Sequence, residues 1–356
     1  DFKTLPNTAT HQENPYVDFD FERLMPHAMS TEGPKMVKGD VNGDGKEDFI
    51  LLQSHGYTDK LFINTGNGFV EKTQSAFDFH KKRESTAGAL FDADGDKDLD
   101  FLVGMGGNQF KEGPENFKAE YYENDGKGNF SLKAINPFNI TGQISTISPA
   151  DFDLDGDVDL FVGARGVPGA YGLIPRSYVL KNNGSSNWED ITNEFTGPIG
   201  MVSDAVWSDI NNDKFPDLMV VGEWMPVTVF INQNGYFSNP SILPLSKGWW
   251  NTVEATDIDN DGDIDYLLGN WGLNMKFKAN TQKPFNAYVY DFDDNKRPDT
   301  ILEWYTSKDD IAYPFASKMD LTAQMPGLKK NTVKYQEFAK LTVKDLFEES
   351  KLKAAV

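Results

Sequence analysis

The 356-residue chain contains no cysteine, which excludes disulfides and thiolate chemistry. It has no run of eighteen apolar residues, which excludes a membrane-spanning helix. Basic residues are scarce, with 34 Lys and Arg against 55 Asp and Glu. The resulting net charge of −21 argues against nucleic acid as a partner, because phosphate backbones are bound through Lys and Arg. The absence of cysteine still permits a place outside the cell, since a core of this size needs no disulfides.

The usual sequence marks of catalysis are also missing. The four histidines are not spaced for a shared metal ion, and no GxSxG, P-loop or GxGxxG pattern occurs. The glycine-rich residues 104–108 follow an apolar run, which favours a turn over a phosphate cradle. The chain begins at Asp1 without Met or an apolar leader, which is typical of a mature, secreted or trimmed form. The sequence therefore favours a non-enzymatic function.

The negative charge is concentrated in six nine-residue segments with one pattern. Positions 1, 3 and 5 are Asp or Asn, and position 9 is Asp. The segments, numbered here as loops 1 to 6, are residues 40–48, 92–100, 151–159, 209–217, 257–265 and 291–299. They hold 26 acidic and five basic residues, so their net charge equals that of the whole chain.

Carboxylates crowded into such short loops repel one another, and a bound cation makes the arrangement sensible. Oxygen ligands without His or Cys select Ca²⁺, whereas Mg²⁺ suits a flexible multi-carboxylate cage less well. Side chains at positions 1, 3 and 5 can converge in a tight loop, and position 7 offers its backbone carbonyl. Since an EF-hand ends with Glu at position 12 and is flanked by helices, this is a different calcium loop, flanked by strands. A single copy can be an ordinary Asp-rich turn, but six copies favour metal.

The pattern predicts up to six Ca²⁺ sites with five ligand positions each. The candidate ligands are Asp40, Asn42, Asp44, Lys46 and Asp48; Asp92, Asp94, Asp96, Asp98 and Asp100; Asp151, Asp153, Asp155, Asp157 and Asp159; Asp209, Asn211, Asp213, Phe215 and Asp217; Asp257, Asp259, Asp261, Asp263 and Asp265; and Asp291, Asp293, Asn295, Arg297 and Asp299. Loops 2, 3 and 5 have four carboxylates at positions 1, 3, 5 and 9 and are ranked strongest. Loops 4 and 6 have Asn at one ligand position and Lys in place of Gly at position 6, and are ranked weakest.

The loops recur at intervals of 34 to 59 residues, and each lies between two short apolar runs such as AGALF at 87–91 and FLVG at 101–104. Continuous apolar runs of this length are typical of strands buried on both faces. In the first four repeats a further strand, an Asn/Gly turn and an aromatic follow, as in LFINTGNGF at 61–69. Four strands in about fifty residues predict a β-propeller blade.

The repeats resemble the FG-GAP/VCBS blades of integrin-α-type β-propellers. More narrowly, the chain resembles bacterial VCBS-repeat proteins related to the ASPIC/UnbV group, of the type frequent in Bacteroidota. The resemblance rests on residues 30–49, 91–108 and 222–232, and on the more specific segments GWWN at 248–251, GNWGLN at 269–274 and YPFASKMDL at 313–321. It implies an all-β propeller that is seven-bladed or an incomplete ring.

The last forty residues differ in composition from the repeats. Ser317 with Asp320 at N3 predicts a helix start, which Pro326 and Gly327 end. Residues 328–341 predict a second helix, and Thr342 with Asp345 predicts a third that extends to about residue 352. The expected division is therefore a propeller over residues 1–315 and a helical insertion over residues 316–356. This insertion either docks a partner or packs on the propeller.

The tryptophans of the later repeats are candidate ligand-binding residues. Trp249, Trp250 and Trp271 lie beside Asn and Gly, and exposed indoles of this kind stack on sugars or clamp peptides. The alternative is that these indoles fill the core between blades. The sequence thus predicts a calcium-binding propeller that acts as a binding module for a glycan or protein.

The expected location is the exterior or outer-membrane surface of a Gram-negative bacterium, because calcium loops of modest affinity are filled outside the cell. The resemblance suggests association with outer-membrane proteins. Two other functions remain open from the sequence: a polysaccharide-active enzyme, either lyase or hydrolase, on a calcium propeller, and a structural adhesive segment of a larger protein.

Overall fold

The computed structural model describes residues 5–110, 113–184, 186–195, 199–272, 275–306, 309–330 and 334–356. The chain divides into two compact units. The first comprises Asp1–Tyr16, Met29–Arg165 and Ile174–Asn270, and the second comprises Val17–Ala28, Gly166–Leu173 and Trp271–Val356. The second unit therefore contains the sixth repeat as well as the C-terminal helices. The domain boundary expected between residues 315 and 316 lies within this unit.

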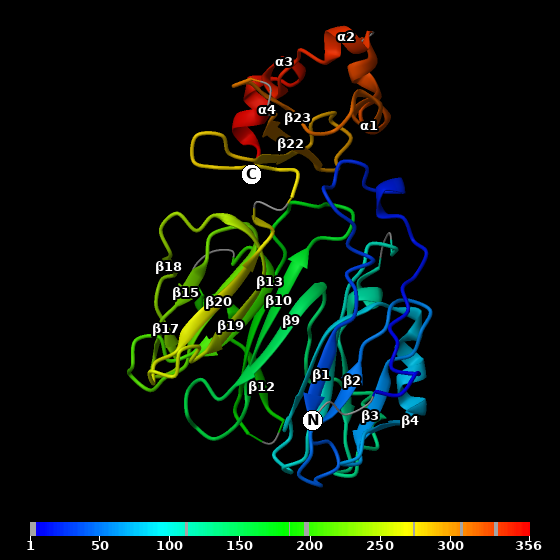
Figure 1. Cartoon of the computed structure of the whole chain (residues 1–356), viewed down its shortest axis with the longest axis vertical. Coiled ribbons are helices and arrows are strands. Elements are labelled where there is room, and N and C mark those ends of the chain that lie inside the picture. Colours follow the sequence, from blue (N-terminus) through cyan, green and yellow to red (C-terminus); the bar gives the residue numbers. More distant parts are fainter. Residues whose placement is uncertain are drawn as a thin grey trace. The chain divides into compact units, whose positions relative to one another are not determined.

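The first three repeats each form a four-stranded antiparallel sheet with the strands in chain order (Figure 1). The strands are β1 (Met36–Gly39), β2 (Asp48–Leu51), β3 (Lys60–Asn64) and β4 (Phe69–Lys72); β5 (Ser85–Phe91), β6 (Asp100–Met105), β7 (Glu120–Glu123) and β8 (Ser131–Leu132); and β9 (Gln143–Ala150), β10 (Asp159–Gly166), β11 (Tyr178–Asn182) and β12 (Trp188–Asp190). In each sheet a predicted loop joins the first strand to the second. This confirms the predicted blade and the predicted strand–turn–aromatic hairpins.

The fourth and fifth repeats share one sheet. The fourth comprises β13 (Met201–Ser208), β14 (Asp217–Met225), β15 (Thr228–Phe230) and β18 (Ser241–Ile242), with the hairpin β16 (Asn232–Gln233) and β17 (Tyr236–Phe237) between them. The fifth comprises β19 (Gly248–Thr256) and β20 (Asp265–Asn270). The end of β14 pairs with the start of β19, where Glu223 lies opposite Trp249. In the second unit, the sixth repeat forms β21 (Asn286–Tyr290), β22 (Asp299–Tyr305) and β23 (Ala312–Pro314).

The second strand of each blade carries the core, as the apolar runs predict. All residues of β2 and β6 are buried, and so are most residues of β10, β14 and β22. In β20 the run Tyr266–Leu268 has the same apolar character but is only partly buried, and Leu267 is 55% exposed. The fifth repeat contributes only two strands within the described residues, which accounts for this exposure.

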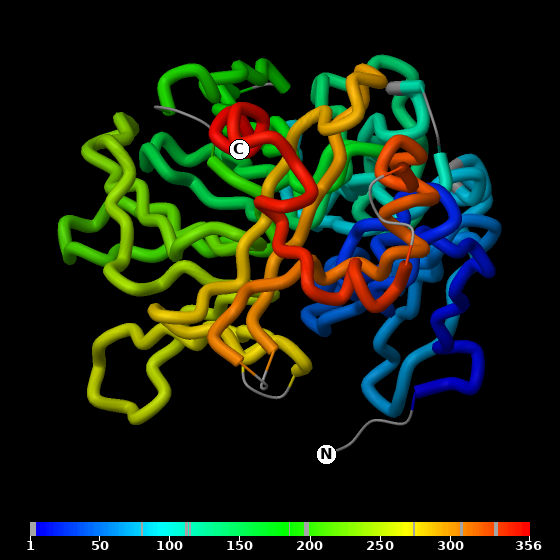
Figure 2. The backbone as a smooth tube through the Cα atoms, turned by 90° about the horizontal axis from the view of Figure 1, so that it is seen from above, coloured from blue at the N-terminus to red at the C-terminus, as the bar shows by residue number. Residues whose placement is uncertain are grey.

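The first strands of successive blades contact one another in the first unit, and Figure 2 follows the chain through these sheets by colour. A hydroxyl on one first strand donates to a carbonyl on the next. Thr86 donates to Ile144 and Ser145 donates to Val202, both over 2.6 Å, and Ser203 donates to Trp250 over 2.7 Å. These bonds connect the second to the fifth blade.

Glycines that end the apolar runs permit this close approach. A Cβ at Gly104 would lie 2.6 Å from the Ile144 side chain, and one at Gly163 would lie 2.6 Å from the Val202 side chain. The runs FLVG and LFVG therefore end in glycine because the next blade packs directly on that position.

Short helices are found in both units. The 3₁₀ helices are η1 (Asp18–Asp20), η2 (Ser75–Lys82), η3 (Pro114–Phe117), η4 (Thr192–Glu194) and η6 (Pro326–Lys330), and the α-helices are α1 (Lys318–Gln324), α2 (Tyr335–Phe338), α3 (Val343–Leu346) and α4 (Glu349–Ala354). Ser317 caps α1 by accepting from the Asp320 amide, and Thr342 with Asp345 forms a capping box on α3, so both predicted helix starts are confirmed.

Two predicted helix lengths are wrong. The helix expected over residues 328–341 is limited, among the described residues, to the four residues of α2 after the 3₁₀ turn η6. The helix expected from Thr342 to residue 352 is broken at Phe347, which is extended, with φ −128° and ψ 148°. Phe347 packs on Phe292 with 4.6 Å between ring centroids, and this burial overrides local helix propensity.

Candidate functional site

The six acidic loops share one backbone conformation. In each loop positions 4 and 6 have positive φ, whatever residue stands there. The pairs are Gly43 and Gly45, Gly95 and Lys97, Leu154 and Gly156, Asn212 and Lys214, Asn260 and Gly262, and Asp294 and Lys296. A bulky residue such as Leu154, at φ 61°, adopts this conformation only when its surroundings impose it. The loops are thus one structural motif, although their sequences vary.

The Asp at position 1 holds the turn. In five loops its two carboxylate oxygens accept from the amides of positions 5 and 6, as Asp151 does from Asp155 at 3.1 Å and from Gly156 at 3.0 Å. In loop 2, Asp92 accepts from Gly95 and Lys97. This explains why Asp occupies position 1 in every copy.

The Asp at position 9 joins the loop to the blade. Its Oδ2 accepts from the amide of position 2 in all six loops. In the first four blades its Oδ1 accepts from the backbone N–H of an Asn at the end of the third strand or within two residues after it. These four residues are Asn64, Asn124, Asn182 and Asn232. In the sixth repeat Gln324 of α1 donates to Asp299 Oδ1 over 3.0 Å, so a helix takes the place of that strand.

Five of the six position-9 carboxylates are buried, and the sixth, Asp265, is half-buried. Asp100 and Asp159 are fully buried, and burial raises the pKa of each carboxyl to about 7. Burial likewise raises the pKa of Asp299 to about 6. A buried carboxylate is stabilised by hydrogen bonds or by a nearby cation, and the loop provides the first of these.

Four loops bring three carboxylates together. The groups are Asp92, Asp94 and Asp96; Asp151, Asp153 and Asp159; Asp257, Asp259 and Asp265; and Asp291, Asp293 and Asp299. Within each group one oxygen from every residue lies within 4.8 Å of the others. Loops 2, 3 and 5, ranked strongest from the sequence, are among them, and so is loop 6, ranked among the weakest.

Orphaned oxygens show that these clusters fit a cation. The Oδ1 atoms of Asp153 and Asp293, members of the clusters in loops 3 and 6, are buried and have no hydrogen-bond partner within the described part of the chain; Oδ1 of Asp98, which lies in loop 2 outside its three-carboxylate group, is in the same state. A buried carboxylate oxygen without a partner is unfavourable unless a cation satisfies it. The donor set is oxygen only, which suits a hard cation such as Ca²⁺.

Loops 1 and 4 differ from the other four. Both have Asn at position 3, and no group of three carboxylates forms in them among the residues that the structure describes. In loop 1 the Lys46 amine lies 2.9 Å from the Asp44 carboxylate. In loop 4 the side-chain amide of Asn211 donates to the Asp213 carboxylate over 3.0 Å. Their assignment as calcium sites stays a prediction.

Position 7 carries chemically unlike side chains, namely Lys46, Asp98, Asp157, Phe215, Asp263 and Arg297. The backbone is the one feature that these six residues share. This variety agrees with the predicted use of the position-7 carbonyl as a ligand, and that use stays a prediction.

The three candidate tryptophans differ in burial and are divided between the two units. Trp249 is 6% exposed and lies 5.0 Å from Trp224 between ring centroids. Trp250, the next residue of β19, is half-buried and donates its Nε1–H to the carbonyl of Ser246. Trp271 is half-buried in the other unit, where it contacts His27 edge to face. Trp249 thus belongs to the interior, and the ligand-binding role of the three stays a prediction.

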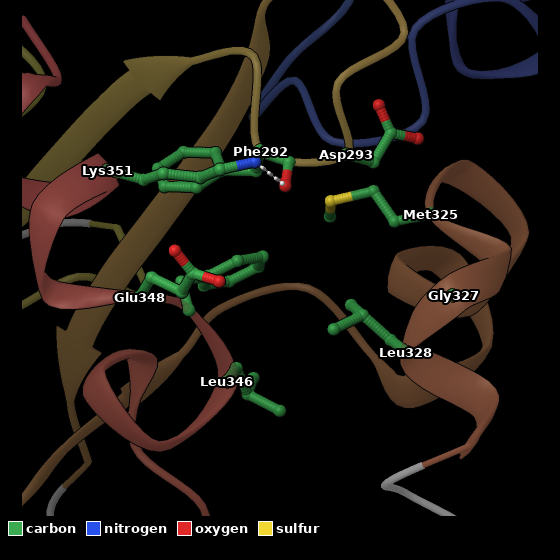
Figure 3. Close-up of a pocket in the computed structure, with 9 residues that line it drawn as sticks. Phe292, Asp293, Met325, Gly327, Leu328, Leu346, Glu348 and Lys351 are labelled. Atoms are coloured by element: carbon green, nitrogen blue, oxygen red, sulfur yellow. Dashed lines mark hydrogen bonds between the residues drawn. The ribbon is translucent and has the colours of Figure 1, made fainter.

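The second unit contains a cavity of about 300 Å³ next to loop 6 (Figure 3). Its lining residues come from the loop and from the helical segment: Phe292, Asp293, Met325, Gly327, Leu328, Leu346, Phe347, Glu348 and Lys351. Lys351 donates to the carbonyl of Phe292 over 3.0 Å and pairs with Asp294 over 2.8 Å. The helical segment therefore braces the sixth loop directly.

Sequence reasoning missed two kinds of functional residue. The Asn/Gly pattern marks the third-strand Asn only as part of a turn, although its recurrence before the turn in four blades is a visible signal. No motif in the sequence indicates a role for Lys181, whose amine lies against Asp153 of loop 3 in the structure.

No helix among the described residues is long and apolar enough to cross a membrane.

Comparison with known proteins agrees with this repeat structure. Residues 40–103, 113–162 and 209–268 match the model of the FG-GAP-like repeat. No curated protein matches the chain significantly.

Two solved structures are similar to this chain at low identity. A lectin from Agrocybe aegerita, described as specifically recognising non-reducing terminal N-acetylglucosamine, is 16% identical with a TM-score of 0.43. The match covers 81% of this chain and 67% of the lectin. A biofilm matrix protein of V. cholerae is 18% identical with a TM-score of 0.33, over 66% of this chain and 34% of that protein. The match thus spans about a third of the V. cholerae protein.

Proposed function

We propose that this chain, an FG-GAP-repeat protein with a β-propeller-like fold, is a calcium-stabilised binding module that works outside the cell. The observation that carries the proposal is the set of four three-carboxylate clusters. Buried, unpartnered carboxylate oxygens of Asp153 and Asp293 belong to two of them. Ca²⁺ bound there neutralises the carboxylates and completes the coordination of those oxygens.

The ion would have a structural role at these loops. Each loop joins the first two strands of a blade, and its position-9 Asp also binds the third strand in the first four blades. Calcium therefore fixes the geometry of three strands at once. The side chains that would hold it are those at positions 1, 3, 5 and 9, together with the carbonyl of position 7.

The proposed location follows from the calcium affinity expected of these loops. Solvent-exposed calcium loops of extracellular modules bind with Kd of about 10⁻⁴–10⁻³ M, so they are filled at the calcium level outside a cell and largely empty in a cytosol. On this basis, and on the resemblance of GWWN and YPFASKMDL to the ASPIC/UnbV-related group, we assign the module to the surface of a Gram-negative bacterium of the Bacteroidota type. There it would bind a glycan or a protein in an outer-membrane-associated assembly.

Calorimetric titration of the metal-free chain tests the calcium assignment. Ca²⁺ should bind with Kd of about 10⁻⁴–10⁻³ M, and Mg²⁺ should bind more weakly. Asp259→Asn, in loop 5, should reduce the number of bound ions, whereas Asp190→Asn, an exposed carboxylate outside the loops, should leave it unchanged. Absence of calcium binding by the wild-type chain would refute the proposal.

A glycan array and an assay on acidic polysaccharides, both with calcium-loaded protein, test the binding role. Binding without turnover supports the module, whereas release of shortened or unsaturated sugars would show an enzyme. If the chain binds no glycan, the proposed ligand is a protein. If it binds neither a glycan nor a protein, the binding role fails and a structural segment is favoured.

A further inference from the structure

Loop 3 differs from the other carboxylate clusters because a lysine reaches it from its own blade. Lys181 lies on β11, and its Nζ forms an ion pair with Oδ2 of Asp153, at position 3 of the loop. The Asp153 side chain is only 9% exposed, and its Oδ1 is buried without a hydrogen-bond partner. Asp153 groups with Asp151 and Asp159. The amine thus contacts the cluster that a calcium ion would occupy.

The position of Lys181 can be compared across blades. It directly precedes Asn182, whose backbone N–H donates to Asp159, the position-9 Asp of loop 3. The residues that precede the corresponding Asn in the first, second and fourth blades are Ile63, Glu123 and Ile231. A positive charge at this position is therefore peculiar to the third blade.

The second blade provides the contrast. Glu123 stands where the third blade has Lys181, and its carboxylate pairs with Lys133. No Lys or Arg side chain contacts Asp92, Asp94 or Asp96 among the described residues. Loops 2 and 3 have equal carboxylate counts in the sequence, yet of these two only loop 3 has a lysine against its carboxylate cluster within the described residues.

We propose that Lys181 is a built-in counter-ion of loop 3, which stabilises the loop without calcium and lowers its calcium affinity. This inference rests on the proposed calcium function. Ca²⁺ entering loop 3 must displace the ammonium from Asp153 or bind beside it, and either event opposes binding. Loop 3 is then a weak site that fills after loops 2 and 5, despite its four carboxylates.

Two glycine amides report on the loops separately. Gly156 donates to Asp151 in loop 3, and Gly262 donates to Asp257 in loop 5, each over 3.0 Å. In glycine-labelled protein, calcium titration followed by NMR should shift both resonances, with Gly262 saturating first. Lys181→Met should tighten the Gly156 midpoint by about tenfold or more, since one like charge is removed a few ångströms from a divalent ion. The Gly262 midpoint in the same spectrum should not move.

Three variants separate charge from packing. Lys181→Arg keeps the charge and should retain the wild-type Gly156 midpoint. Lys247→Met removes an exposed lysine elsewhere in the first unit and should change neither midpoint. Asp153→Asn should remove the Gly156 response, which identifies it as loop 3.

Thermal unfolding gives a second readout that a purely structural ion pair would not give. Lys181→Met should melt below wild type in chelator, because Asp153 loses its counter-ion. The deficit should close or reverse in about 10 mM calcium. An equal deficit in both conditions, with an unchanged Gly156 midpoint, would overturn the inference while leaving the calcium function intact. If calcium shifts neither Gly156 nor Gly262 in the wild-type chain, the calcium function itself fails.

Discussion

Asn232 should be one of the strongest structural contacts between blades. Its side chain is completely buried, and its Nδ2 donates to the carbonyl of Phe152, in loop 3 of the preceding blade, over 2.6 Å and to that of Pro216 over 2.9 Å. Its Oδ1 accepts from Gly235 over 2.8 Å. Asn232→Ala removes three hydrogen bonds and leaves the buried carbonyl of Phe152 and the partly buried carbonyl of Pro216 without this donor.

The expected loss in unfolding free energy is roughly 3–4.5 kcal/mol, since each of the three bonds contributes about 1–1.5 kcal/mol net. Asn232→Asp keeps the volume but sets an acceptor against two carbonyls, so its loss should be at least as large. The control is Asn183→Ala, an exposed Asn whose loss should be below about 0.5 kcal/mol. Urea unfolding in saturating calcium measures all three. A loss below about 1 kcal/mol for Asn232→Ala would refute the claim that these hydrogen bonds hold the fourth blade together and tie it to Phe152 of the third blade.

Three further outcomes are expected. In calcium, Asp261→Ala should lower the melting temperature more than Asp213→Ala, because loop 5 gathers three carboxylates and loop 4 does not; the reverse order would refute the ranking. Glu84 is 4% exposed, and burial raises its pKa to about 7, above the unfolded value near 4.5. Its protonated form therefore stabilises the fold at low pH, and this contribution, about 3 kcal/mol, is lost as pH rises from about 4.5 through 7. Unfolding in chelator from pH 5 to 8 should show this slope in wild type and less of it in Glu84→Gln; equal slopes would contradict the assignment. Leu154→Gly should stabilise the chain by about 1 kcal/mol, because Leu154 is half-exposed and its φ of 61° is strained for a residue with a Cβ atom. A lower melting temperature for this variant would show that the contacts of the Leu154 side chain outweigh the backbone strain.

The repeat and the loops were predictable because their signals are local. The 1-3-5-9 spacing, the apolar runs and the Asn/Gly turns lie within a few residues of one another, and they predicted the four-stranded blades. The left-handed conformation of Lys97 was not predictable from its residue type, since only the comparison of six copies shows that the backbone, rather than glycine, is the constant feature.

What was missed depends on long-range contacts. Lys181 meets Asp153 across 28 residues, and Asn124 donates to the carbonyl of Val41 in the preceding blade across 83 residues. Neither contact has a spacing that a single sequence reveals. The helix after Thr342 ended early for a similar reason, because Phe347 packs against Phe292 of loop 6.

The fold's dependence on calcium is the central claim, and thermal unfolding with and without the ion tests it most directly. Each filled loop should add about 2.7 kcal/mol when calcium exceeds Kd a hundredfold. The melting temperature should therefore fall by many degrees in excess chelator and recover when calcium, but not an equal concentration of magnesium, is restored. An unchanged melting curve in excess chelator would contradict the account.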